Sequence, residues 1–115
     1  MAPDPREVAF SATELFCETR VPEEHSDEVL VECSRRGNSI TIVERRPPWD
    51  PERMAPEWSS LKVAQLRWDP ATRRWSLYCR DSNERWWPYD QVAPSPSVDP
   101  LLAEIDADPT GIFWG

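Results

Sequence analysis

The stretch from Leu66 to Asp90 constrains the fold more than any other part of the chain. It reads LRWDPATRRWSLYCRDSNERWWPYD and holds four of the seven tryptophans and both tyrosines. Proline after aspartate at Asp69-Pro70 suits a type I turn, and apolar and polar residues alternate on both sides of it. We therefore expect a hairpin of Leu61–Trp68 and Trp75–Asp81, followed by a short edge strand at Arg85–Tyr89.

The first half of the chain predicts a helix and a second hairpin. Asp4-Pro5 has the chemistry of a helix start, and Val21-Pro22 ends the helix because the residue before proline avoids the α region. A Gly37-Asn38 turn tolerates positive φ and joins two alternating runs. The runs are Val29–Arg35 and Ser39–Arg45, and the expected apolar stripe of the helix is Val8, Ala12, Leu15 and Phe16.

The C-terminal part predicts a second, shorter helix and a docked end. Asp99-Pro100 resembles a cap followed by a first-turn proline, and an apolar stripe follows it. Ile112-Phe113-Trp114 would expose large apolar groups unless it packs on the sheet. The chain is thus expected to be α+β, with a five-stranded antiparallel meander sheet and both helices on one face. A length of 115 residues suits one domain, residues 1–115.

Charge is distributed unevenly along the chain. The net charge is −8, yet residues 35–85 carry eleven Lys and Arg against seven Asp and Glu, while the flanks carry two against fourteen. Overall acidity disfavours nucleic-acid partners. The basic middle either pairs with the acidic ends inside the fold or forms a surface for a ligand.

The sequence predicts neither a metal site nor a cofactor. Cys17, Cys33 and Cys79 are widely separated, and His25 is the only histidine, so zinc-ligand spacing is missing. An alternation of acidic residues at Asp106 and Asp108 imitates half a calcium loop but is better explained as a helix-end turn. No apolar run approaches the ~20 residues of a membrane span, and the first ten residues do not form a signal peptide. We expect a cytoplasmic protein.

Arginine and aromatic residues indicate a candidate binding surface. On the strand Trp75–Asp81, Trp75, Leu77 and Cys79 share a face that suits the core, while Ser76, Tyr78 and Arg80 share the other. Arginine binds carboxylate or phosphate bidentately, and aromatic rings dominate binding hot spots. The alternative is that Arg45 and Arg46 pair with acidic residues of the termini while Trp49 caps the core. The predicted binding residues are Arg45, Arg46, Trp49, Tyr78, Arg80 and Tyr89.

These features favour a non-enzymatic interaction module that binds a protein or peptide partner or an anionic ligand. One alternative is a small hydrolase or transferase with Asp81 or Asp106 as base, although no activated nucleophile accompanies them. Another is a single-stranded nucleic-acid binder on an aromatic sheet. No catalytic residue is assigned. A homodimer remains open if the strand that holds Pro88 is a sheet edge.

Several blocks in order resemble a known family. They are ITIVERRPPW (Ile40 to Trp49), VAQLRWDPATRRWSLYCRD (Val63 to Asp81), LLAEIDADPTGIFWG (Leu101 to Gly115) and the Phe-Cys-x-x-Arg-Val-Pro segment from Phe16. Together they are similar to the bacterial domain-of-unknown-function family 3024, with Cys79 and Trp87 where the family pattern has Trp and His. The resemblance implies a small cytoplasmic bacterial protein and carries over no catalytic residue.

Overall fold

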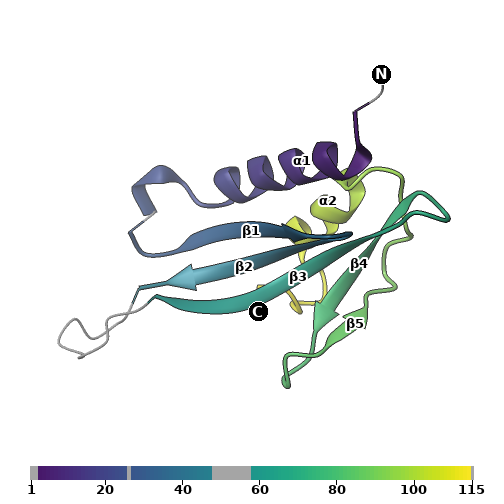
Figure 1. Ribbon diagram of the computed structural model, residues 1–115. Helices are drawn as coiled ribbons and strands as arrows, with labels where there is room; N and C mark the ends of the chain where they lie inside the picture. Colours follow the sequence, from purple (N-terminus) through teal and green to yellow (C-terminus); the bar gives the residue numbers. More distant parts are fainter. Residues whose placement is uncertain (1–2, 26, 48–57, 115) are drawn as a thin grey trace.

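The computed structural model describes residues 3–25, 27–47 and 58–114, without the side chain of Glu23. An N-terminal helix and a short C-terminal helix lie on one side of a five-stranded antiparallel sheet, as expected (Figure 1). The elements in order are α1 (Pro5–Arg20), the 3-10 turn η1 (Glu23–His25), β1 (Leu30–Arg36), β2 (Ser39–Arg46), β3 (Ser59–Asp69), β4 (Arg74–Arg80), β5 (Trp86–Pro88) and α2 (Asp99–Ala107).

The first helix begins where the sequence predicts. The Asp4 carboxylate accepts a hydrogen bond from the backbone N–H of Arg6 at 2.9 Å and also pairs with the Arg6 guanidinium. Because the first N–H groups of a helix lack partners within it, this side chain stabilises the start of α1. The helix ends at Arg20, and Val21 is already extended.

The buried face of α1 matches the predicted stripe only in part, because Ala12 and Phe16 pack against the core while Val8 and Leu15 do not. Val8 and Leu15 are 53% and 61% exposed, whereas Ala9, Thr13 and Cys17 face the sheet. The Thr13 hydroxyl donates to the Ala9 carbonyl at 2.7 Å, so its polar group is satisfied inside the core. The small side chains allow α1 to lie close to β1. The prediction of Val8 and Leu15 as core residues is therefore wrong.

The sheet is a simple meander in the order β1-β2-β3-β4-β5. Its central strand, β3, is the longest; it pairs with β2 from Ser59 to Arg67 but with β4 only over its second half. The register of β2 against β3 shifts between Ile42 and Val43, which marks a bulge at Val63. On its other side β3 pairs with β4 only from Gln65 to Asp69. Figure 1 shows β4 and β5 turning away from the first half of β3.

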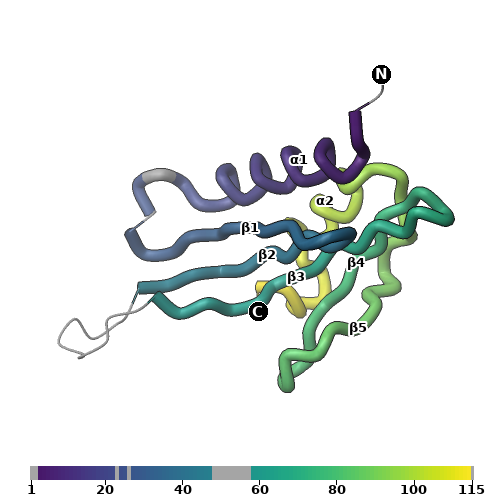
Figure 2. The backbone as a smooth tube through the Cα atoms, viewed as in Figure 1, coloured from purple at the N-terminus to yellow at the C-terminus, as the bar shows by residue number. Residues whose placement is uncertain are grey.

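The core lies between the sheet and the two helices. After β5 the chain returns along β4, where Trp75 and Ser95 exchange backbone hydrogen bonds, and then enters α2 (Figure 2). The C-terminal segment docks only partly as expected. Phe113 is buried, but Ile112 is 44% exposed and Trp114 contacts the helices, because its Nε1 donates to the Ile105 carbonyl of α2. Asp108 accepts hydrogen bonds from the backbone N–H groups of Phe113 and Trp114. Asp108 is thus a helix-end residue of α2. The fully buried side chains are Trp75, Ile40, Ile42, Leu66, Leu77, Leu101, Ile105, Val63 and Thr13.

Among the described residues, no helix is both long and apolar enough to cross a membrane.

Candidate binding site on the open sheet face

One face of the sheet has no described helix over it, and we call it the open face. Strand register assigns residues to it, because successive side chains point to opposite faces and paired residues share a face. None of its residues is fully buried. They are Leu30, Glu32, Ser34, Arg36, Ser39, Thr41, Val43, Arg45, Ser60, Lys62, Gln65, Arg67, Asp69, Arg74, Ser76, Tyr78, Arg80, Trp86 and Pro88.

Charge separates between the two layers of the molecule. The open face carries six Lys and Arg side chains against two carboxylates, whereas α1 and α2 carry six carboxylates against two arginines. Six of the eleven Lys and Arg residues in the basic middle of the sequence thus share one surface on the side of the sheet away from the acidic helices. Such a surface attracts anions locally even though the whole chain is acidic.

Tyr78 and Arg67 form the centre of the open face. The guanidinium carbon of Arg67 lies 3.9 Å from the centroid of the Tyr78 ring, a cation–π contact between neighbouring strands. Arg67 also donates through Nε to Gln65 at 2.7 Å, and Gln65 donates to the Thr41 hydroxyl at 3.0 Å. This chain of contacts fixes the guanidinium plane, and its remaining N–H groups are available for a ligand.

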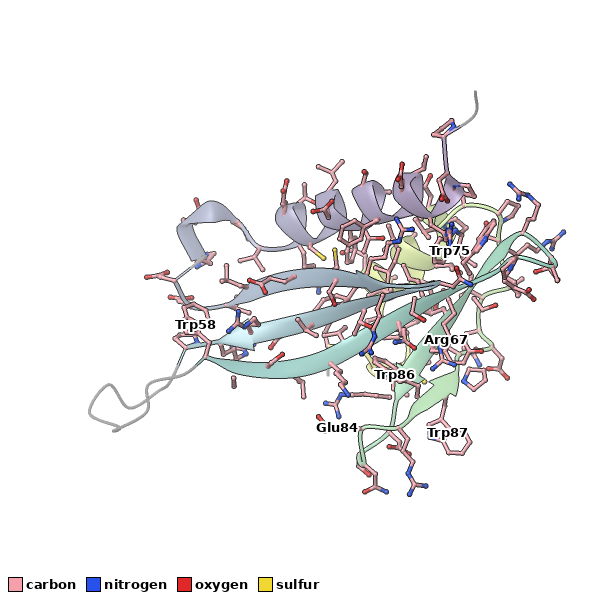
Figure 3. The ribbon with its side chains drawn as sticks, viewed as in Figure 1. Trp58, Arg67, Trp75, Glu84, Trp86 and Trp87 are labelled. Atoms are coloured by element: carbon pink, nitrogen blue, oxygen red, sulfur yellow. The ribbon has the colours of Figure 1, made fainter. Side chains whose placement is uncertain are left out.

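Arg80 lies where β3 and β4 separate. The backbone pairing of β3 with β4 ends at Gln65. Beyond it, the Arg80 side chain of β4 bonds to β3 instead, because its Nε donates to the Lys62 carbonyl at 2.6 Å. Trp86 lies opposite Arg80 on β5. Figure 3 shows Arg67 and Trp86 on the side of the sheet away from α1, whereas Trp75 points toward the helices. Two cations and two aromatic rings therefore gather beside this opening.

The first half of β3 is an unpaired sheet edge within the described residues. Residues 59–64 pair with β2 on one side, and no described strand pairs with their other side. Lys62 points to the open face, while Leu61, 43% exposed, points to the opposite face. Apart from the Lys62 carbonyl, which accepts a hydrogen bond from Arg80, such an edge offers backbone N–H and C=O groups to an incoming strand.

A cavity of about 260 Å³ opens beside Tyr78. Its lining combines Ser76 and Pro88 with Val92 and Pro94 of the connector after β5. The lining is mainly apolar, which suits an uncharged side chain or ring next to the arginine cluster.

The predicted pair Arg45 and Arg46 does not act as one site. Arg45 lies on the open face within 3.5 Å of Glu32, while Arg46 lies on the opposite face and donates to Glu44 at 2.7 Å. The partner of Arg45 is a carboxylate of the adjacent strand β1, and the partner of Arg46 is a carboxylate of its own strand β2, rather than carboxylates of the chain termini. The sheet itself therefore separates Arg46 from Arg45, Tyr78 and Arg80.

Tyr89 is a core residue. It pairs with Leu77 across the β4–β5 ladder, which places it on the helix side, and its side chain is 8% exposed. Its ring packs against Phe113 at 5.0 Å and its hydroxyl donates to Glu104. The grouping of Tyr89 with Tyr78 on one surface is wrong. Trp49, the remaining predicted residue, lies outside the described residues.

The two carboxylates considered as catalytic bases make structural contacts. Asp81 accepts hydrogen bonds from Trp87 Nε1 and from the backbone N–H groups of Asn83 and Arg85, and these bonds lower the pKa of its carboxyl group. Asp106 pairs with Arg20 at 2.6 Å. Because its pKa is lowered, the Asp81 carboxylate is a weak base near neutral pH. Among the described side chains, no group of three or more metal-ligating residues gathers.

Sequence reasoning missed Arg67, Lys62 and Trp86. Alternation along β3 places Arg67 opposite the apolar Leu66 and Trp68, so its face could be read from the sequence. Lys62 could not, because the bulge at Val63 reverses the alternation.

Fold and site together define a small α+β sheet protein with one open, arginine-rich face. Comparison with protein families shows more: residues 1–115 match the family described as Domain of unknown function (DUF3024), so the chain belongs to that family. This match confirms the family resemblance of the sequence. A search of curated proteins and a search of solved structures gave no significant match.

Proposed function

We propose that the protein is a non-enzymatic binding module that takes up an extended, acidic peptide segment of a partner protein. The segment adds to the free edge of β3 as a further strand. Its carboxylates face Lys62, Arg67 and Arg80 on the open face, and its alternate residues face Leu61 on the other side. Strand addition supplies affinity through the backbone, and the side-chain pattern supplies specificity.

The observation that carries this proposal is the separation of β3 from β4 at Gln65, with Arg80 beside the unpaired edge. An edge alone binds any strand, and an arginine cluster alone binds any anion. Their combination selects an extended chain with carboxylates on one face. The three free cysteines support a reducing, cytoplasmic setting.

The test uses a short fluorescein-labelled peptide that alternates glutamate with valine, and its binding is measured by fluorescence anisotropy. Arg80→Ala should weaken binding about tenfold, the effect of losing one charge-assisted hydrogen bond. Arg35→Ala is the matched control, because it removes one positive charge from the opposite side of the sheet. That variant should bind like the wild type. If both variants lost the same amount of peptide affinity, the effect would come from the overall charge of the protein, and the proposed site would be wrong.

Two further probes separate strand addition from other modes. The same peptide N-methylated at every second residue cannot donate hydrogen bonds along one edge, and it should not bind. A single-stranded oligo-deoxythymidine should bind more weakly than the glutamate peptide. Tighter binding of the oligonucleotide would replace the proposal with a nucleic-acid stacking surface.

A further inference from the structure

A second site lies on the helix side of the molecule, where α1 packs over β1. Cys17 of α1 and Cys33 of β1 line one cavity of about 270 Å³. Cys17 is 4% exposed, while Cys33 is only half-buried and accessible from the cavity. Val31 and three glutamates complete the lining, namely Glu14, Glu18 and Glu32.

The two thiols differ in acidity because they interact. The hydrogen bond between them, followed by burial, raises the pKa of the Cys17 thiol, and the same bond lowers the pKa of Cys33. Cys33 is also the more accessible thiol of the pair, so we assign it as the one that ionises and meets reagents from the cavity, while the buried Cys17 keeps its proton. The thiolate is the reactive form of cysteine, so Cys33 is the more nucleophilic of the two.

We propose that Cys17 and Cys33 form an oxidation site that hydroperoxides convert reversibly into an intramolecular disulfide. The Cys33 thiolate attacks the terminal peroxide oxygen, the O–O bond breaks, and the leaving oxygen takes up a proton, so that Cys33 sulfenic acid forms together with water from hydrogen peroxide or an alcohol from an organic hydroperoxide. The Cys17 sulfur then attacks the Cys33 sulfur, the S–O bond breaks, and the departing hydroxide takes the Cys17 proton to form water. Two thiols are oxidised and one peroxide is reduced.

The charges around the cavity select the oxidant. Glu14, Glu18 and Glu32 repel anionic reagents such as glutathione disulfide, whereas hydrogen peroxide is neutral and small enough to enter. The site is thus specific for a neutral hydroperoxide. The disulfide would join α1 to the edge strand β1 covalently, and this inference is independent of the peptide site on the other face.

The experiment treats the full chain with hydrogen peroxide, blocks the remaining thiols, and maps disulfides by mass spectrometry of proteolytic fragments. The expected product is a monomer with a Cys17–Cys33 bond and a free Cys79, and dithiothreitol should restore all three thiols. Glutathione disulfide at the same concentration should react much more slowly. A bond to Cys79 or an interchain dimer as the main product would overturn the proposal.

Variants assign the roles of the two sulfurs. Cys17→Ser should accumulate a sulfenic acid at Cys33 that dimedone traps, whereas Cys33→Ser should give no adduct at Cys17. Cys79→Ser is the control, because Cys79 is buried on β4 and its pKa is raised by burial; it should form the disulfide at the wild-type rate. A dimedone adduct at Cys17 in the Cys33→Ser protein would reverse the assignment. Mapping of the wild-type disulfide decides the proposal even if a serine variant fails to fold.

Discussion

Tyr78 and Tyr89 show how strand register separates a surface aromatic from a core aromatic. Pro88 lies opposite Tyr78 and therefore shares the open face, while Tyr89, one residue further, lies opposite Leu77. A shift of one residue turns a side chain to the other face. The Tyr89 hydroxyl reaches Glu104 of α2 at 2.8 Å, so this residue joins β5 to the C-terminal helix.

Tyr89→Phe tests this structural role. The ring contact with Phe113 remains, but the hydrogen bond to Glu104 is lost, which should lower the free energy of unfolding by about 1 kcal/mol. Urea denaturation measures the change. Tyr78→Phe is the control and should leave stability unchanged, because its ring can still stack on Arg67. A wild-type urea midpoint for Tyr89→Phe would contradict the contribution of this bond.

At the scale of elements, local signals in the sequence located the helices and strands, but not their long-range partners. Asp4, Pro5 and Pro22 act within one turn of the backbone, and they gave the bounds of α1. The face of α1 depends on how closely it approaches β1, and this favours Ala9 and Thr13 over the larger Val8. The separation of β3 from β4 at Gln65 and the bulge at Val63 are likewise features whose positions no local pattern marks.

The start of α1 should respond to pH through Asp4. Its hydrogen bonds to Arg6 lower the pKa of the Asp4 carboxyl group from 3.8 to about 2. A lowered pKa in the folded state means that the charge contributes stability above pH 3.8, and that this contribution is lost as pH falls through about 2. Asp4→Asn keeps a capping side chain without the charge. Its melting temperature should lie below that of the wild type at neutral pH and converge with it on acidification. A constant difference down to that pH would assign the effect to capping geometry instead.

At the scale of the whole molecule, the net charge hides two surfaces of opposite sign. An acidic helix layer and a basic open face lie on opposite sides of one sheet. Packed layers are separated by about 10 Å, which equals the Debye length near 0.1 M salt. An anionic ligand on the far side of the sheet lies beyond this distance from the helix charges, so salt near 0.1 M screens most of their repulsion. The net charge of −8 therefore does not prevent local binding of an anion.

This geometry predicts an unusual salt dependence for the glutamate-valine peptide. At about 0.01 M salt the Debye length is roughly 30 Å, so repulsion from the whole acidic chain reaches the ligand. Near 0.1 M salt that repulsion is screened, while the short contacts of the ligand with Arg67 and Arg80 persist. Near 1 M salt the Debye length falls to about 3 Å, and these short contacts are weakened too. Affinity should therefore be highest at intermediate salt. Halving the net negative charge of the two helices with Glu14→Gln and Glu18→Gln should raise affinity at low salt only. A steady decline from the lowest salt concentration in the wild type would show that the helix layer does not influence the open face.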